Sequence, residues 1–211
     1  MDTHRLPPAC VVLEGPAPGL WHTLTRARMG SPWQHAWMLL DAWAGIESTW
    51  AGVRTFDPLE RFAQLEQGRA FVILDPYWLT DDERRAVADS ARSFVGRGYD
   101  FGQWLWWALT RSFWDDGTGR MICSRLLTAA FEAALDTHPF DHDAGRSMGA
   151  AHRRRGWVTP NDWRYCPYLR CIVAVQSSVP SLHAQDLPTT IWPSPWGDRH
   201  AVGSPRPPKE V

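Results

Sequence analysis

The chain has 211 residues, 44% of them hydrophobic, which suits one domain with a real core plus appendages. Its formal net charge of −1 gives no electrostatic argument for binding nucleic acid or an anionic membrane. No signal-peptide pattern is visible, and no apolar run approaches the roughly 20 residues that span a bilayer. Arginine supplies nearly all of the positive charge, with Lys209 the only lysine, a composition that favours a GC-rich bacterium or its phage. We therefore expect a cytoplasmic or phage-associated protein without a transmembrane segment.

The first part of the sequence predicts strands arranged around one hairpin. Residues 9–13 and 69–74 are short apolar runs with β-branched residues, so each is expected to form a strand. Between them, residues 34–40 and 46–54 predict the two arms of a hairpin that reverses at residues 41–45. A short helix is expected at residues 20–29, and a loop or short helix at residues 57–64.

The hairpin brings a histidine and a carboxylate together. His35 lies near the start of the first arm and Glu47 near the start of the second. An antiparallel register places Glu47 close to Trp37, one diagonal step from His35 and on the same face. A slip of one residue would send Glu47 to the other face, and a lone histidine in a strand is often purely structural.

The next part of the sequence predicts two helices. Thr80 and Glu83 form a capping box in front of an amphipathic helix over residues 83–95. Residues 103–113 predict a tryptophan-rich helix with little polar surface, which is either buried or faces a partner or an acyl chain. Burial is the expected outcome, because soluble proteins seldom expose large apolar patches.

A cysteine stands at the start of a further helix. Over residues 119–135 the apolar side chains recur at helical spacing, after a glycine-rich turn, and this places Cys123 at or near the first turn. A helix start carries unpaired N–H groups and a partial charge of roughly +0.5, which favour a thiolate nucleophile. The alternative is that Cys123 is a small buried hydrophobe.

The rest of the chain suggests no metal centre. Without a secretion signal the cysteines are expected to be reduced, although Cys166 and Cys171 would be near enough to pair in an oxidising compartment. Residues 136–155 read as a solvated loop, because the spacing of their acidic and histidine side chains matches no known site. These side chains are His138, Asp141, His142 and Asp143. Residues 158–163 predict a turn leading into a short helical segment, and residues 165–177 a last strand. We expect one domain over residues 1–178, followed by a proline-rich flexible tail over residues 179–211.

Three segments together resemble a known superfamily. They are Gly-Ser-Pro-Trp-Gln-His-Ala at residues 30–36, Ile-Glu-Ser at residues 46–48, and Gly-Tyr-Asp-Phe at residues 98–101 followed by Met-Ile-Cys-Ser-Arg-Leu-Leu at residues 121–127. Their order, histidine then acid then cysteine, resembles the circularly permuted papain-like families of the NlpC-type superfamily. Within it the YiiX/YaeF-like proteins are the nearest pattern, and lecithin retinol acyltransferase is more distantly similar. The resemblance spans residues 9–163 and departs from the family at Gln34, where serine often precedes the histidine.

The resemblance implies a fold and a set of roles. The fold would be α+β, papain-like and circularly permuted, with an antiparallel sheet packed against helices that include the nucleophile helix. Cys123 would attack a carbonyl, His35 would handle the proton, and Glu47 would orient the imidazole. Tyr99 would line the oxyanion region, or else be a packed core tyrosine.

The substrate stays open at this point. The resemblance is compatible with a cysteine peptidase or amidase that cleaves a peptide, a cell-wall amide or an ester without a cofactor. A lipid-directed acyltransferase or deacylase is an alternative, with the tryptophans of residues 104–114 as an acyl-binding wall. A non-catalytic binding module on the same fold is the third possibility.

Overall fold

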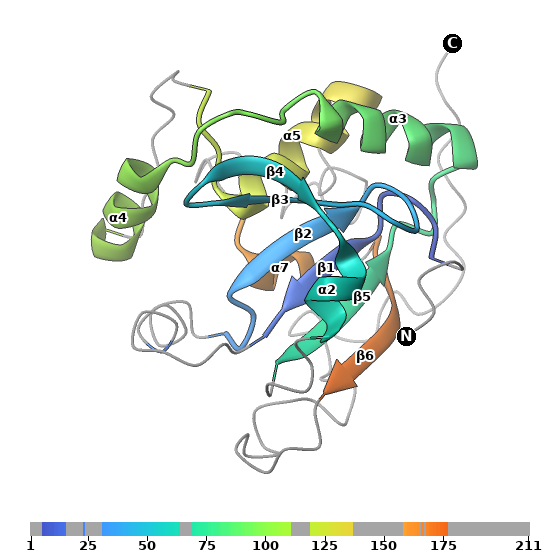
Figure 1. Ribbon diagram of the computed structural model, residues 1–211, viewed down its shortest axis with the longest axis horizontal. Helices are drawn as coiled ribbons and strands as arrows, with labels where there is room; N and C mark the ends of the chain where they lie inside the picture. Colours follow the sequence, from blue (N-terminus) through green and yellow to red (C-terminus); the bar gives the residue numbers. More distant parts are fainter. Residues whose placement is uncertain are drawn as a thin grey trace.

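Six strands form a single antiparallel sheet in the computed structural model (Figure 1). The structure describes residues 6–15, 23, 31–63, 69–110, 119–136, 158–164, 166 and 168–176. The strands lie side by side in the order β4-β3-β2-β1-β5-β6. They are β1 (Val11–Glu14), β2 (His35–Leu39), β3 (Gly45–Thr49), β4 (Gly52–Phe56), β5 (Ala70–Asp75) and β6 (Arg170–Gln176). The expected strands at residues 9–13 and 69–74 are confirmed as β1 and β5. The strand expected over residues 165–177 is confirmed as β6 from Arg170 onward, whereas Cys166, Tyr168 and Leu169 precede the strand.

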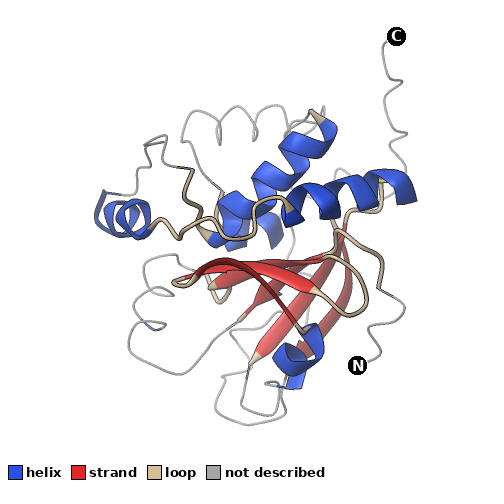
Figure 2. Cartoon of the chain, turned by 45° about the horizontal axis from the view of Figure 1, so that its top comes forward, coloured by secondary structure: helices blue, strands red, loops and turns tan. Residues whose placement is uncertain are grey.

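Helices cover both faces of this sheet. The described helices are α2 (Pro58–Ala63), α3 (Asp81–Arg92), α4 (Phe101–Thr110), α5 (Cys123–Leu135) and α7 (Pro160–Arg164), of which α4 lies beyond the end of the sheet. Figure 2 shows α3 and α5 crossing one face, while the short α2 lies against the other. The fold is therefore a mixed α/β arrangement in which an antiparallel sheet packs against helices, as expected.

Strand alternation explains why both faces are apolar. Val11 and Leu13 of β1 point into the core beneath α3 and α5, whereas Val12 points toward α2. In β2, Met38 likewise points toward α3 and α5, and Trp37 points toward α2. Central strands that are buried on two sides read as continuous hydrophobic runs, which is how they were recognisable in the sequence.

The second arm of the expected hairpin is wrong as a single strand. Residues 46–54 fold back at Trp50 and Ala51 and form β3 and β4, with Thr49 opposite Gly52. Gly52 has a φ of 92°, and a side chain there would come within 2.5 Å of the Arg97 carbonyl oxygen. The turn needs glycine at this position for both reasons.

A loop from the end of α3 runs along the outer edge strand. The Val53 N–H donates to the Arg97 carbonyl at 2.8 Å, and the Gly96 N–H donates to the Val53 carbonyl at 2.9 Å. This pairing holds the loop against β4. The loop then continues to Tyr99 and into α4. The capping box of Thr80 and Glu83 is confirmed, although α3 begins at Asp81, two residues before the expected start.

Several expectations fall outside the described residues. They are the helix over residues 20–29, the loop containing His138, Asp141, His142 and Asp143, and the tail over residues 179–211. Among the residues that are described, no helix is long and apolar enough to cross a membrane.

Candidate active site

Cys123 is the first residue of α5, and neighbouring segments fix its place. Met121 lies beside Tyr99 in a parallel bridge, and the Met121 N–H donates to the Gly98 carbonyl at 3.0 Å. The Ser48 hydroxyl donates to the Met121 carbonyl at 2.6 Å, which ties β3 to the same segment. The N-cap of α5, Ile122, offers no side-chain hydrogen bond, so no polar side chain at the cap competes for the first N–H groups. The helix start is thus available to the sulfur.

His35 and Glu47 meet as the hairpin register predicts. Met38 pairs with Ile46, and extending that register by one residue places Glu47 opposite Trp37. The His35 Nε2–H donates to Glu47 Oε2 at 2.9 Å. The same imidazole hydrogen-bonds the Cys123 sulfur, so the three side chains form one continuous line. The imidazole side chain is 21% exposed, whereas the Glu47 carboxylate is fully buried.

Two arginines that the sequence reading missed hold the buried carboxylate. Arg54 lies directly opposite Glu47 on β4. It donates to Glu47 Oε1 from Nε at 3.1 Å and from Nη2 at 2.9 Å. Arg61 of α2 donates to Oε2 at 2.6 Å. Arg61 also pairs with Glu14 at 3.5 Å, and Arg69 contacts the same Glu14. Both oxygens of Glu47 are therefore occupied by cationic or imidazole donors, which fixes the carboxylate plane.

These contacts set the ionisation of the three groups. Burial alone would raise the pKa of Glu47, but the hydrogen bond from His35 and the charges of His35 and Arg61 outweigh it and lower the pKa to about 2. Burial alone would lower the pKa of His35, but its hydrogen bonds to Cys123 and Glu47 raise the pKa to about 9. Burial would likewise raise the pKa of Cys123, yet the hydrogen bond and charge of His35 lower it. The site thus favours a thiolate facing an imidazolium.

Backbone amides add to the stabilisation of the sulfur. The N–H groups of Ala36 and Ser124 both hydrogen-bond Cys123 and lower its pKa. Ala36 belongs to β2 and Ser124 to the first turn of α5, so the sulfur sits where the sheet and the helix start meet. The helix start therefore acts on Cys123 as its sequence position predicts.

Tyr99 is near enough to Cys123 for their charges to interact. Burial and the nearby charges of Cys123 and Asp100 raise its pKa well above the usual range, so its hydroxyl stays protonated and available as a donor. The Trp50 ring stacks on the Tyr99 ring with centroids 5.6 Å apart. Tyr99 is partly buried, and its contact with Trp50 agrees with the alternative of a packed tyrosine ring.

The other cysteines differ from Cys123. All four are free thiols. Burial raises the pKa of Cys10 and of Cys166 to about 12, and Cys171 is exposed. The pKa of Cys123, in contrast to those of Cys10 and Cys166, is held below its ordinary value.

We expect the contribution of Cys123 to stability to grow with pH. A thiol whose pKa is lower in the folded than in the unfolded state stabilises the fold fully above its unfolded pKa of 9.0 and loses this effect as pH falls through the folded value. The excess unfolding free energy of the wild type over Cys123→Ser should therefore be larger at pH 8 than at pH 5. Urea titrations of both proteins at the two pH values measure it, and an excess that does not change with pH would contradict the assigned thiolate.

The fold is recognisable in a solved structure, although no protein-family model matches the sequence and no curated protein matches it. The six-stranded sheet and its helices are similar to the crystal structure of the metalloprotein yiiX from Escherichia coli O157:H7, with a TM-score of 0.59. The two chains are 16% identical over 81% of this chain and 98% of that one. This chain therefore has a YiiX-like fold.

The name of that neighbour calls it a metalloprotein, so the donor set of this chain is relevant. The part of the chain that the structure describes contains no group of three or more histidine, cysteine, aspartate or glutamate side chains that could hold a metal ion. Glu47, the carboxylate nearest to His35, is already engaged by His35, Arg54 and Arg61. These residues do not fit a metal site, and no step proposed below passes through one.

Proposed function

We propose that this protein is a cysteine-dependent hydrolase of the circularly permuted papain-like type, acting on an amide or ester bond. The observation that carries the proposal is the continuous line from the Cys123 sulfur through the His35 imidazole to the buried Glu47 carboxylate. A thiolate at a helix start, paired with an imidazolium that a third group orients, is the arrangement that nucleophilic acyl transfer requires.

In the proposed reaction the Cys123 thiolate attacks the substrate carbonyl carbon. The tetrahedral intermediate collapses, the bond to the amine or alcohol breaks, and the leaving group takes a proton from the His35 imidazolium. Water then attacks the thioester while His35 accepts its proton, and the thiolate departs. Because Glu47 engages Nε2, the other ring nitrogen is left to exchange protons with sulfur, leaving group and water.

Two further groups have supporting roles in this proposal. Glu47 orients the imidazole and stabilises its charged form, and it remains ionised at any physiological pH because its pKa is about 2. The protonated Tyr99 hydroxyl and a backbone N–H at the start of α5 would donate to the oxyanion.

A second candidate is a lipid-directed deacylase or acyltransferase. It is favoured by the aromatic side chains near Tyr99, where the Trp50 ring contacts the rings of Tyr99, Phe101 and Trp104. The chemistry at Cys123 would be the same, with an acyl chain along these rings and either water or an alcohol as the acceptor.

The test uses p-nitrophenyl acetate, whose acyl group reports on any activated thiol. We expect an acetyl adduct on Cys123 by peptide mass spectrometry, together with turnover that is lost in Cys123→Ala and retained in Cys171→Ala. Cys171 is the matched control because it is exposed and distant from His35 in the sheet order. Equal adduct on Cys123 and Cys171, without turnover, would favour the non-catalytic binding module.

A further inference from the structure

Helix α4 is an uncharged, largely exposed helix. Its sequence, Phe-Gly-Gln-Trp-Leu-Trp-Trp-Ala-Leu-Thr, contains no ionisable side chain. Figures 1 and 2 both show it standing beyond the end of the sheet rather than on one of its faces. The expected burial of this helix is wrong for the side chains that are described, since Phe101, Leu105, Trp106 and Leu109 are all exposed, Leu109 to 70%.

The β3–β4 turn extends this surface. Trp50, at the tip of the turn, is 69% exposed. Its ring centroid lies 4.9 Å from that of Phe101 and 6.1 Å from that of Trp104. We call the combined surface the aromatic ridge, made of Trp50, Tyr99, Phe101, Trp104, Leu105, Trp106 and Leu109. Two separate parts of the chain thus contribute exposed apolar side chains that meet where Trp50 contacts Phe101 and Trp104.

Exposed basic side chains lie beside the ridge in the part of the chain that the structure describes. In the described segments that carry or adjoin it, residues 50–56, 96–106 and 119–123, the basic side chains are Arg54, Arg97 and Arg120, and all three are exposed. The single carboxylate there, Asp100, is buried and accepts a hydrogen bond from the Gln103 N–H at 2.8 Å. Arg54 is already paired with the buried Glu47, so Arg97 and Arg120 remain as the exposed basic side chains that adjoin the ridge.

We propose that the aromatic ridge seats on the surface of a phospholipid bilayer that contains anionic headgroups. Tryptophan and phenylalanine side chains favour the boundary between headgroups and acyl chains, and an uncharged helix face can enter that boundary. Exposed arginines beside it are attracted to the negative surface. A protein partner or a second copy would cover the apolar surface without giving the arginines a role.

This docking would deliver substrate to the proposed chemistry. Tyr99 stacks on Trp50 in the ridge and is near enough to Cys123 for their charges to interact, so docking would bring the membrane surface toward the candidate nucleophile. The inference rests on the proposed function for its biological purpose, since the substrate would then be an acyl lipid. Binding itself requires only the ridge and the arginines.

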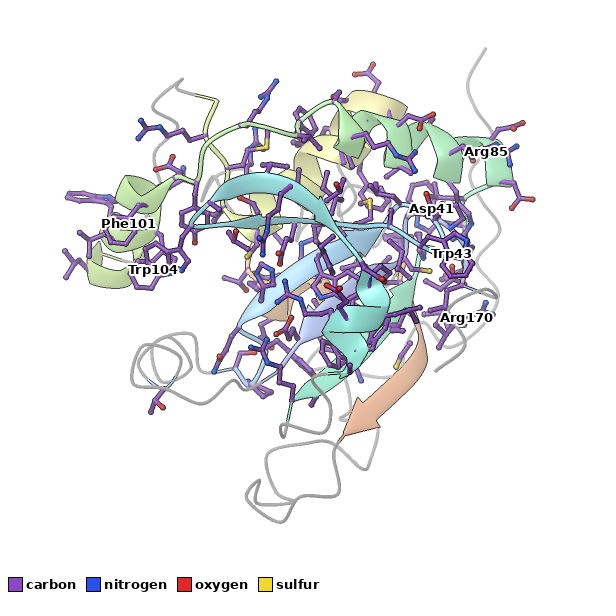
Figure 3. All side chains as sticks on the ribbon, in the orientation of Figure 1. Asp41, Trp43, Arg85, Phe101, Trp104 and Arg170 are labelled. Carbon is purple, nitrogen blue, oxygen red and sulfur yellow. The ribbon has the colours of Figure 1, made fainter. Side chains whose placement is uncertain are left out.

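The test is vesicle flotation of the full chain. Vesicles of phosphatidylcholine with phosphatidylglycerol should carry the wild type, and pure phosphatidylcholine should carry less. Trp50→Ala combined with Leu109→Ala should weaken partitioning by at least tenfold, because each large apolar side chain contributes on the order of tenfold when buried. The matched control is Trp43→Ala, which removes a tryptophan that is 60% exposed on the side of the molecule opposite Phe101 and Trp104 (Figure 3), and it should leave partitioning unchanged.

Three outcomes would overturn the docking. They are absence of flotation by folded wild-type protein, equal losses in the Trp43 and Trp50 variants, and a concentration-dependent dimer that disappears in the Trp50 variant. Flotation of Cys123→Ala separates this inference from the proposed function. If that variant floats normally but p-nitrophenyl acetate turnover is absent even in the wild type, the hydrolase proposal fails and the docking stands. If the wild type hydrolyses p-nitrophenyl acetate but neither it nor Cys123→Ala floats, the docking fails and the hydrolase proposal stands.

Discussion

Replacing His35 by alanine should lower the rate at which iodoacetamide alkylates Cys123 at pH 6 by at least tenfold. The hydrogen bond and charge of His35 lower the pKa of this thiol in the wild type. Without the imidazolium, a thiol of ordinary pKa near 8.5 would be only about 0.3% ionised at that pH. A more basic thiolate is the better nucleophile and recovers part of this loss, which is why the expected effect is smaller than the change in ionised fraction.

The other cysteines provide internal references for this measurement. Exposed Cys171 should react at the same slow rate in wild type and variant, and buried Cys10 and Cys166 should stay largely unmodified, since their pKa values are about 12. Peptide mass spectrometry after short exposures gives each rate separately. A Cys123 rate that is unchanged in His35→Ala, or no faster than that of Cys171 in the wild type, would remove the basis for an activated thiolate.

Glu47→Gln should cost about 3 kcal/mol of unfolding free energy, in the range found when one partner of a buried ion pair is removed. Arg61 is only 15% exposed and would lose its closest anionic partner, while the weaker pair with Glu14 would remain. The pKa of His35 should also fall from about 9, because the Glu47 hydrogen bond and charge help to raise it. Urea unfolding at pH 7 measures the first effect, and Cys123 alkylation measures the second.

Asp75→Asn is the matched control. Asp75 is another buried carboxylate of the same sheet, held by Arg84 at 2.7 Å and by Arg170 at 2.9 Å, and it lies on β5 rather than in the candidate site. It should lose comparable stability while Cys123 alkylation stays as in the wild type. If Glu47→Gln also left alkylation unchanged, Glu47 would be a structural carboxylate rather than a residue that positions His35.

The sequence was sufficient to predict those parts of the site that depend on helical spacing and on the register of one hairpin. Helical spacing after a glycine-rich turn placed Cys123 at a helix start, and a hairpin reversal at residues 41–45 brought Glu47 diagonally to His35. The papain-like and permuted assignments came from motif order, and they remain part of the proposed function.

What the sequence reading missed depends on tertiary placement. Arg54 becomes the cross-strand partner of Glu47 only because the chain reverses at Trp50, and the prediction of residues 46–54 as one continuous arm missed that turn. Gly52 was the residue in the sequence that could have indicated the turn, since a glycine suits a tight reversal between two strands. Arg61 reaches Glu47 from α2, the helix that follows β4. The periodicity of the sequence does not indicate this contact. The exposure of α4 was missed because apolar composition normally means burial.

The loop that pairs with Val53 has a consequence for self-association. An outermost strand with open N–H and C=O groups invites strand addition from another molecule. In β4 the hydrogen bonds with Gly96 and Arg97 occupy this position, and the same loop then continues to Tyr99. Substitutions that displace the loop would therefore expose unpaired N–H and C=O groups at the edge of the sheet and would also disturb Tyr99. Aggregation and loss of the site should accordingly appear together.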